Sequence, residues 1–584
     1  MNPRAPQRFQ ASAEDFKKIP GSPIAYWVSA KILELFAQSK QLYEFSVSDG
    51  QNITADNSKY VRFYWEVESQ EVGVKRGKWV FYAKGGSFRK WYGNLEYVVD
   101  WSDKARNHYR AHPSARVIPE YLWFKEGITW TLITSSKQSF RLLPHTATFD
   151  KGGSSIFLND SLSLKGALLF LNTSLSEYLL KIFNTTLNLQ VDDVRKLPIT
   201  PNSLNVNINH ADTFLEVAKN DWDNFETSWD FQDLPLLRGG QGLGVRDEGQ
   251  GTSPTPLSPH PSSLPPLSPR SSSLKGETLE ASWENWATHL RENIATMQRL
   301  ETENNRLWIA AYGLQDELTP EVPEDEITLA RPDRRKDMAA FLSYAVGCML
   351  GRYALGTPGL ILADAGATLA DYWKKVNTDA GSGDRPFQPD ADGLIPILDG
   401  EWFDDDIVGR TREFLRVTFG EAALAQNIAF IEQSLGKDLR SYFATQFYKD
   451  HLQTYKKRPI YWLFRSPRGG FQCLMYLHRY TKDTANVVLN RYLREYIGRL
   501  EARIAQLDLD LTHEGTPARD KARMLKERDQ LRRTLRECQD WERDVLLPLA
   551  QRRIQLDLDD GVKVNYLKLG PALAPIAGLE AREA

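Results

Sequence analysis

The sequence predicts a mixed α/β domain, followed by a mainly α-helical region that contains an antiparallel helical hairpin. Two observations lead to this fold class. Before residue 235, apolar and polar residues alternate in short segments rich in aromatic and β-branched side chains, which is typical of strands. From Trp283 onward, apolar residues recur every three or four positions, which is typical of helices packed on a core.

A tract rich in Ser, Pro and Gly separates the two regions. Such a tract cannot bury enough apolar surface to offset the entropy lost on ordering, so we predict a disordered, inserted linker. The expected divisions are an α/β domain (1–235), the linker (236–276), a mainly helical domain (277–480), a helical hairpin (481–548) and a C-terminal segment (549–584).

Three segments illustrate the strands and helices that we predict in the α/β domain. Residues 61–67 and 96–101 are short, alternating and rich in aromatic and β-branched side chains, and we expect strands there. Residues 168–183 repeat apolar side chains at intervals of three and four, and we expect a helix there.

The region after the linker begins with an amphipathic pattern. Six apolar residues share one helical face, and core packing explains them better than a cofactor site does. They are Trp283, Trp286, Leu290, Ile294, Met297 and Leu300. Residues 337–353 predict a buried helix in which Gly347 and Gly351 allow a second helix to approach closely.

A heptad-like seam predicts the hairpin. It consists of Leu493, Ile497, Leu500, Ile504, Leu507 and Leu511. A turn at 515–517 follows, and the returning helix presents Met524, Leu531, Leu535, Cys538 and Val545. The hairpin resembles the spacers of restriction-modification enzymes by analogy, and a structural scaffold is the default interpretation.

Composition narrows the possible function classes. The formal net charge is −3, yet residues 59–141 hold 15 Lys and Arg against 8 Asp and Glu. A basic zone in a mildly acidic chain indicates either one module that faces nucleic acid or a solvated basic face. The three cysteines are far apart, which argues against zinc and disulfides. We find no signal peptide and no long apolar run, and we expect a cytoplasmic protein without a membrane span.

Residues 79–98 are the most informative segment. Aromatic rings alternate there with Lys84, Arg89 and Lys90 around flexible glycines. Rings can stack on bases and cations can contact phosphates, so the mixture suits a nucleic-acid groove. An ordinary aromatic sheet edge is the alternative from composition alone.

The amino-acid sequence of this segment, and of several others, resembles that of the PglX family, the adenine-specific DNA methyltransferases of BREX phage-defence systems. The similar segments are 16–27, 79–98, 124–130, 135–137, 149–157, 184–188 with Gln190, 197–199, 313–323, 343–353, 458–465 and 556–566. Because they spread over most of the chain, the resemblance is specific.

The resemblance implies site-specific N6-adenine methylation of double-stranded DNA with S-adenosylmethionine as cofactor. Such enzymes carry an Asn-Pro-Pro-aromatic motif that holds the flipped adenine, and the sequence contains none. The glycines of 239–244 follow no strand pattern and are weak evidence for a cofactor loop. We therefore expect the recognition and C-terminal part of such an enzyme, without a cofactor site or activity of its own.

The expected partners follow from that reading. They are duplex DNA, a separate chain with the methyltransferase domain, and other BREX proteins. The alternative is a non-catalytic assembly or sensor module that docks other defence proteins. An independent nuclease or helicase is disfavoured, because we find no P-loop and no nuclease carboxylate set.

The expected DNA-binding residues follow from the resemblance and from side-chain chemistry. They are Lys84, Arg89, Lys90, Trp91, Tyr92, Asn94, Lys125, Trp130, Ser135, Ser136, Lys137 and Arg141. Among them, Trp91, Tyr92 and Trp130 are expected to stack on bases or wedge between them. The pairs at 85–86 and 152–153 are expected to form turns or close backbone contacts.

Two further groups have competing interpretations. The acids at 404–406 and at Asp557, Asp559 and Asp560 suggest metal binding, but turns and helix N-termini explain them better. A second aromatic and basic cluster at 458–470 suits either another DNA contact or an interface packed against the hairpin.

Overall fold

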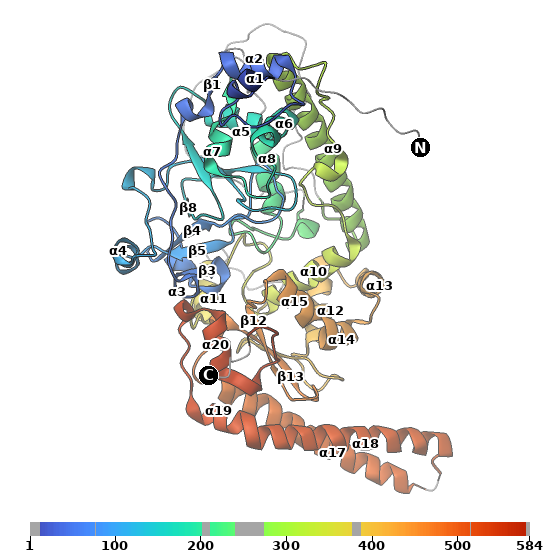
Figure 1. The fold of residues 1–584 in the computed structure, drawn as a ribbon. Helices are drawn as coiled ribbons and strands as arrows, with labels where there is room; N and C mark the ends of the chain where they lie inside the picture. The colour runs from blue at the N-terminus through green and yellow to red at the C-terminus, as the bar shows by residue number, and fades with distance from the viewer. Residues whose placement is uncertain are drawn as a thin grey trace, which may run out of the picture.

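The computed structural model describes residues 12–75, 77–200, 211–239, 274–376, 387–513 and 515–579. The predicted fold class is confirmed: a mixed α/β domain precedes a mainly helical region (Figure 1). Most of the predicted linker, residues 240–273, lies outside the described residues. The two ends of that gap meet, because the amides of Leu274 and Lys275 both donate to the carbonyl of Arg238 at 3.0 Å.

The α/β domain contains two four-stranded sheets and one two-stranded sheet. The first has the order β2 (Ser46–Val47), β9 (Ser155–Leu158), β6 (Gly127–Trp130), β7 (Phe140–Leu143), and its pairs are antiparallel. The second has the order β3 (Val61–Phe63), β5 (Tyr97–Asp100), β4 (Trp79–Ala83), β8 (Ala147–Phe149), and only its β4–β8 pair is parallel. The small sheet pairs β1 (Lys40–Gln41) with β10 (Pro198–Ile199).

Local hydrogen bonds change two of the predicted elements. The strand expected at 61–67 ends at Phe63, because the carboxylate of Glu66 accepts from the Phe63 amide at 2.9 Å and closes a 3₁₀ turn. The helix expected at 168–183 is divided between α5 (Leu164–Leu171) and α6 (Ser174–Phe183). Asn172 bonds to the backbone of Phe140 instead, and Thr173 caps α6.

The remaining helices of this domain lie around the sheets. They are α1 (Ala13–Lys17), α2 (Ala30–Gln38), α3 (Asn57–Tyr60), α4 (Asp103–Ala111), α7 (Val191–Arg195) and α8 (Ala211–Trp222). Helices α5, α6 and α8 lie beside a long helix, α9 (Leu279–Ala311), which runs along one side of the molecule (Figure 1).

Helix α9 joins the two regions into one body. Its first half places Trp286 and Leu290 in a core shared with the C-terminal region. Its second half places Met297, Leu300 and Trp308 in the core of the α/β domain. The predicted apolar face is confirmed as a packing surface, but it serves two cores.

The region after α9 is mainly helical. Its helices are α10 (Arg334–Met349), α11 (Leu369–Val376), α12 (Ile407–Phe419), α13 (Leu424–Leu435), α14 (Leu439–Tyr442), α15 (Tyr448–Thr454) and α16 (Thr484–Val487). A three-stranded antiparallel sheet that was not predicted has the order β11 (Leu394–Pro396), β13 (Gln472–Tyr476), β12 (Tyr461–Arg465). The close approach expected at Gly347 exists, but a Cβ there would meet the ring of Tyr353 rather than a second helix.

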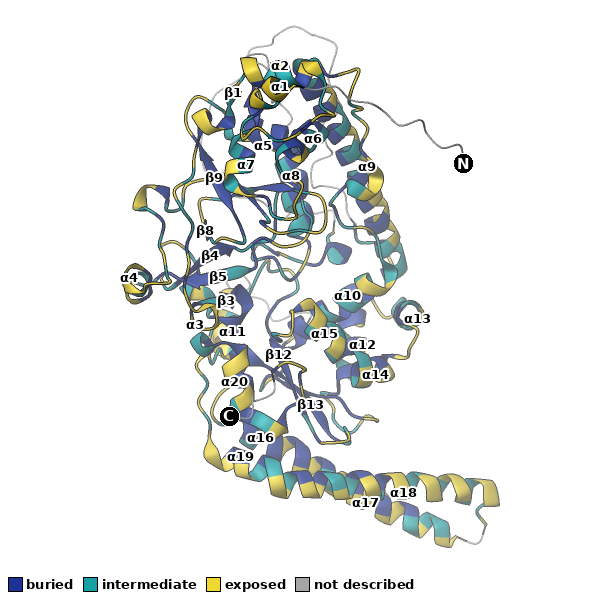
Figure 2. Cartoon of the chain, in the orientation of Figure 1, coloured by how far each residue is buried: buried dark blue, intermediate teal, exposed yellow. Residues whose placement is uncertain are grey.

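The predicted hairpin is confirmed. Helices α17 (Arg494–Thr512) and α18 (Ala518–Trp541) project from the body as an antiparallel pair (Figure 1). Leu500, Ile504 and Leu507 of the predicted seam are buried against Leu531 and Cys538. Figure 2 shows the buried seam between two exposed outer faces. Helices α19 (Leu547–Arg552) and α20 (Val562–Leu569) return the chain to the body.

All three cysteines are buried and free, and burial raises the pKa of the Cys538 thiol to about 12. In the described parts of the chain, no helix combines the length and apolarity needed to span a membrane.

Candidate nucleic-acid interface

Two glycine turns that the sequence singled out pack against each other. A Cβ on Gly85 would lie 2.6 Å from the carbonyl oxygen of Gly152, and one on Gly152 would lie 2.9 Å from the carbonyl oxygen of Lys84. A Cβ on Gly153 would overlap the carbonyl of Ala83. The expected close backbone contacts are therefore confirmed, and side chains larger than hydrogen are excluded there.

Two more segments join these turns. The Thr131 hydroxyl donates to the Gly86 carbonyl at 3.1 Å, and the Leu132 amide donates to the Gly152 carbonyl at 3.0 Å. The Thr134 amide in turn donates to the Leu187 carbonyl at 3.1 Å. Residues 84–87, 131–136, 150–153 and 184–188 thus form one surface, which we call the glycine edge.

The glycine edge is rich in hydroxyl groups and poor in acids. Its charged residues are Lys84, Asp150 and Lys151, and Lys84 is paired with Asp150. Ser135, Ser136 and Lys151 are exposed. Hydroxyls and a lysine without an excess of acids are suited to phosphate contacts.

The cations of the segment 79–98 mostly bind acids inside the protein. Arg89 forms an ion pair of 2.6 Å with Asp221 at the end of α8, and its guanidinium lies 4.9 Å from the ring centre of Trp222. The Asp221 side chain is 2% exposed. Burial raises the pKa of Asp221, and the Arg89 charge offsets part of that shift.

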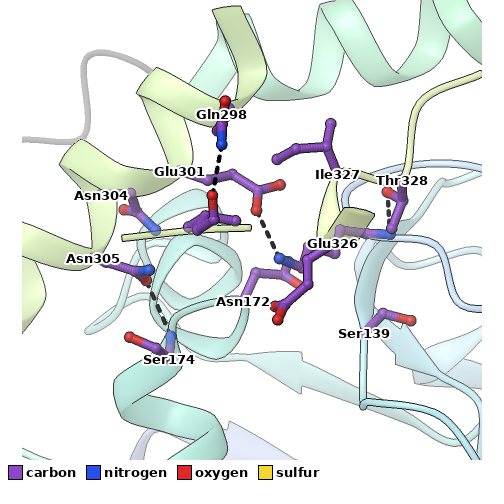
Figure 3. A network of polar contacts seen from close by, with 12 residues as sticks. Ser139, Asn172, Ser174, Gln298, Glu301, Asn304, Asn305, Glu326, Ile327 and Thr328 are labelled. Carbon is purple, nitrogen blue, oxygen red and sulfur yellow. Dashed lines mark hydrogen bonds and ion pairs between the residues drawn. The ribbon is translucent and has the colours of Figure 1, made fainter. Parts of the chain in front are cut away.

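Glu301 of α9 holds the next two residues. Its two carboxylate oxygens accept from Lys90 Nζ at 2.6 Å and from Trp91 Nε1 at 2.8 Å. The Lys90 amide donates to the Thr328 hydroxyl at 3.0 Å. Figure 3 shows Glu301 projecting from α9 into this network, beside Asn304 and Asn305. The aromatic and basic segment is therefore fixed to α9 from within.

Three more predicted residues lie in the interior. Trp91 is 1% exposed and stacks on Phe214 with ring centres 4.2 Å apart. Trp130 is 0% exposed and donates to the Leu189 carbonyl at 3.0 Å. Arg141 is 1% exposed and donates to the Arg89 carbonyl at 3.0 Å. Burial, together with the nearby Arg89 charge, lowers the pKa of Arg141 to about 10.

The other predicted residues are distributed over different surroundings. Tyr92 is half-buried, and Asn94 donates to the Ser87 carbonyl at 2.9 Å, so it supports the glycine edge. Lys137 follows the edge and pairs with Glu326 at 2.6 Å. Lys125 is exposed but precedes β6, whereas Ser135 and Ser136 follow it. The strand therefore separates Lys125 from the edge.

A cavity of about 240 Å³ lies where the α/β domain meets α9. Lys90, Lys137, Asn172 and Ser174 line it, together with Asn305. The Asn305 side chain accepts from the Ser174 amide at 3.0 Å (Figure 3). Lys90, which Glu301 holds, therefore forms part of the cavity wall.

The acids considered for metal binding have structural partners. Asp406 caps α12 through the Val408 amide at 3.0 Å and pairs with Arg440. Asp559 accepts from Lys78 Nζ at 2.5 Å and from Trp79 Nε1 at 2.9 Å. Within the described ranges, no group of three or more His, Cys, Asp and Glu residues is placed to hold a metal ion.

The second aromatic and basic cluster packs against the hairpin. Trp462 and Phe464 on β12 are 0% exposed. Glu537 of α18 accepts from the Ser466 hydroxyl at 2.5 Å and from the Arg468 amide at 2.7 Å. Of the two interpretations, the packed interface is the one that the contacts support.

Several residues of this region were not singled out from the sequence. Lys151 stands in a segment that carried the resemblance, so its position was available. Glu301 and Asp221 gave no signal, because they lie more than a hundred residues from the cations that they bind. Ile133 and Leu187, which are 64% and 60% exposed, carry no charge or ring that would mark them.

Comparison with known proteins adds independent findings. No protein-family model matches the chain. The chain is 33% identical over 598 residues to the adenine-specific methyltransferase PglX of Lacticaseibacillus casei (strain Zhang). It is 32% identical over 598 residues to the adenine-specific methyltransferase BrxX of Escherichia coli O9:H4 (strain HS). Each match covers 97% of this chain and 46% of the relative, so the chain spans about half the length of these proteins. The resemblance found in the sequence is therefore confirmed, and the chain is PglX-like over nearly its whole length.

Proposed function

We propose that this chain is the DNA target-recognition part of a site-specific N6-adenine methyltransferase of BREX-type phage defence. The observation that carries the proposal is the glycine edge, where residues of four separate PglX-like segments form one surface together with residues 131–134. That surface offers hydroxyls and Lys151, and its one acid is neutralised by Lys84. Groups of this kind position a protein on the DNA backbone.

Methyl transfer is assigned to a domain outside this sequence. The Asn-Pro-Pro-aromatic motif and a convincing glycine-rich cofactor loop are both missing from the 584 residues. The relatives, which are about twice as long, are named adenine-specific methyltransferases. S-adenosylmethionine would therefore bind to a methyltransferase domain that is not within these 584 residues, and these residues would select the site.

Eleven of the twelve expected DNA-binding residues then fall into two roles, and Lys125, which β6 separates from the glycine edge, is assigned neither. Lys84, Asn94, Ser135, Ser136 and Lys137 are proposed to contact DNA or to shape the surface that does. Arg89, Lys90, Trp91, Tyr92, Trp130 and Arg141 are proposed to act from beneath, because their side chains are buried or held by internal partners.

The first test is incorporation of a labelled methyl group into host-type DNA. The full chain alone is compared with the chain plus the product of the adjacent upstream gene, as the candidate carrier of the methyltransferase domain. Activity in the mixture only supports a split enzyme. Activity of the chain alone would contradict the assignment of catalysis to a partner.

A second test measures duplex binding against salt. Lys151→Ala should reduce the slope of log K against log salt by about 0.9, the value of one phosphate contact. Lys526→Ala removes an exposed lysine from α18 and should leave the slope unchanged. An equal loss in both variants would remove the glycine edge from the DNA face.

The projecting hairpin favours a second candidate function, an assembly module for other defence proteins. Leu509 and Leu525, near the far end of the hairpin, are 62% and 41% exposed. Binding of a protein partner through these side chains would persist at high salt, whereas DNA binding would weaken steeply. A salt-resistant complex that Leu509→Ser with Leu525→Ser abolishes would support this candidate.

A further inference from the structure

The outer end of the glycine edge is a short two-stranded ribbon. Residues 132–134 lie antiparallel to residues 187–189, with Ile133 opposite Asn188. The Leu189 amide donates to the Leu132 carbonyl at 2.9 Å, and the Thr134 amide donates to the Leu187 carbonyl at 3.1 Å. Backbone hydrogen bonds on both sides of the Ile133 pair therefore fix the ribbon.

This ribbon changes abruptly from buried to exposed. Leu132 and Leu189 are 5% and 2% exposed and anchor it in the domain. Ile133 and Leu187, one and two residues further out, are 64% and 60% exposed. Because side chains alternate along a strand, and Ile133 faces the same side as Asn188, Leu187 points to the other side. Each face of the ribbon thus ends in an aliphatic side chain.

We propose that this ribbon enters the major groove of duplex DNA and that the aliphatic residue on the face turned to the bases, Ile133 or Leu187, contacts the methyl group of a thymine. The inference rests on the proposed function and names one feature of the DNA sequence that the chain would recognise, a thymine. The major groove admits a two-stranded ribbon, and the thymine methyl is the apolar group that base pairs present there. An aliphatic side chain placed against it distinguishes thymine from the other bases.

The surroundings of the two side chains favour DNA over an apolar protein partner. Thr134, Ser135, Ser136, Thr185 and Thr186 flank them and supply hydroxyls. Hydroxyls reach phosphates and base edges, so a ribbon with an aliphatic residue on each face and a hydroxyl rim matches a groove. The neighbouring Asp150 is neutralised by Lys84, and Lys151 is exposed.

Two of the three rings expected to contact bases are not available for that task. Trp91 and Trp130 are 1% and 0% exposed, and their indole nitrogens donate to Glu301 and to the Leu189 carbonyl. Trp130 instead supports the ribbon, since its partner carbonyl belongs to the second ribbon strand. Base contact is therefore assigned to an aliphatic residue of the ribbon that Trp130 supports.

The test uses the full chain and a sequence selected from random duplexes. Each thymine of the selected duplex is replaced singly by deoxyuridine, which removes only the methyl group. At one or more positions, this replacement should weaken binding by about fourfold, the equivalent of one buried methyl group. One of the two variants Ile133→Ala and Leu187→Ala should bind the selected duplex and its deoxyuridine counterpart equally, whereas Ile24→Ala, at a site that is 73% exposed, should keep the preference.

Other outcomes separate the two proposals. Failure of the random pool to yield a preferred sequence would overturn the proposed function together with this inference. A preferred sequence whose binding is indifferent to deoxyuridine would overturn the inference alone. The same holds if both alanine variants keep the deoxyuridine effect. If Ile133→Ala or Leu187→Ala abolishes binding to the methyltransferase-domain chain without changing the base preference, the ribbon is a protein contact and the inference is overturned as well.

Discussion

Residues 88–98 and the glycine edge illustrate how two regions with similar chemistry acquire different surroundings. Both include sequence that resembles the PglX family, and both contain groups that suit nucleic acid. In the first, Arg89 and Lys90 bind buried acids and Trp91 is 1% exposed. In the second, Ser135, Ser136 and Lys151 face outward. Composition indicates which groups are present, and their partners decide which of them remain accessible.

The distant partners also change the meaning of the basic zone. The excess of cations within 59–141 is not entirely an excess of surface charge, because acids from other elements neutralise part of it. Asp221, Glu301 and Asp559 bind Arg89, Lys90 and Lys78. A basic stretch of sequence can therefore build an interior joint as well as a DNA-binding face.

Substitution of Lys90 is expected to have the largest effect on the free energy of unfolding. Lys90→Met leaves Glu301, whose side chain is 3% exposed, as a buried carboxylate without its cation. We expect the free energy of unfolding to fall by about 3–5 kcal/mol. Urea unfolding followed by tryptophan fluorescence measures the loss.

The matched control for that variant removes both charges. Lys90→Met combined with Glu301→Gln should recover most of the lost stability, because no charge stays buried and the Gln oxygen still accepts from Trp91. Equal stability of Lys90→Met and the parent would show that the ion pair does not hold the segment.

A smaller effect is expected where the two glycine turns meet. Gly153→Ala places a methyl group on the Ala83 carbonyl, and the resulting displacement should cost about 1–3 kcal/mol and weaken duplex binding. Gly498→Ala is the control, since its Cβ has no heavy atom of another group within 4 Å on helix α17. The control should stabilise the protein by about 0.5–1 kcal/mol. Unfolding midpoints and duplex affinity are compared in the same buffer, and an unaffected Gly153→Ala variant would contradict the tight turn.

Substitution of Arg141 is expected to have the smallest effect on stability. Its guanidinium is as buried as Trp91, yet its hydrogen-bond partners include the Arg89 carbonyl and the Thr131 hydroxyl rather than a carboxylate. Arg141→Met leaves no charge uncompensated, so stability should change by about 1 kcal/mol or less. The same urea experiment applies. A loss as large as that of Lys90→Met would mean that burial, rather than the partner carboxylate, sets the cost.

Features that depend on nearby residues could be predicted from the sequence. The seam from Leu493 to Leu507 repeats over one helix, and the hairpin follows from it. The glycine pairs at 85–86 and 152–153 predicted turns or close backbone contacts, and a Cβ at any of the four would meet another atom at 2.9 Å or less. Each of these features depends on few residues, and each prediction held.

Features that depend on distant contacts could not be predicted. The single helix expected at 168–183 is interrupted, because Asn172 bonds to Phe140 on a neighbouring strand. The interior position of Lys90 depends on Glu301, which is 211 residues away. The aliphatic character of a side chain does not indicate whether it is exposed. Leu132 and Ile133 are adjacent in sequence, but Leu132 is buried and Ile133 is exposed.

The closure of the chain at Arg238 has a practical consequence for protein engineering. The amides of Leu274 and Lys275 both donate to that carbonyl, so the chain leaves and rejoins the body at nearly one point. Lengthening a connection between two adjacent ends changes its closure free energy by only about 0.6 kcal/mol per doubling. A fluorescent protein whose own termini lie close together could be spliced in there. It would report on the whole molecule in living cells while both cores keep their contacts with α9.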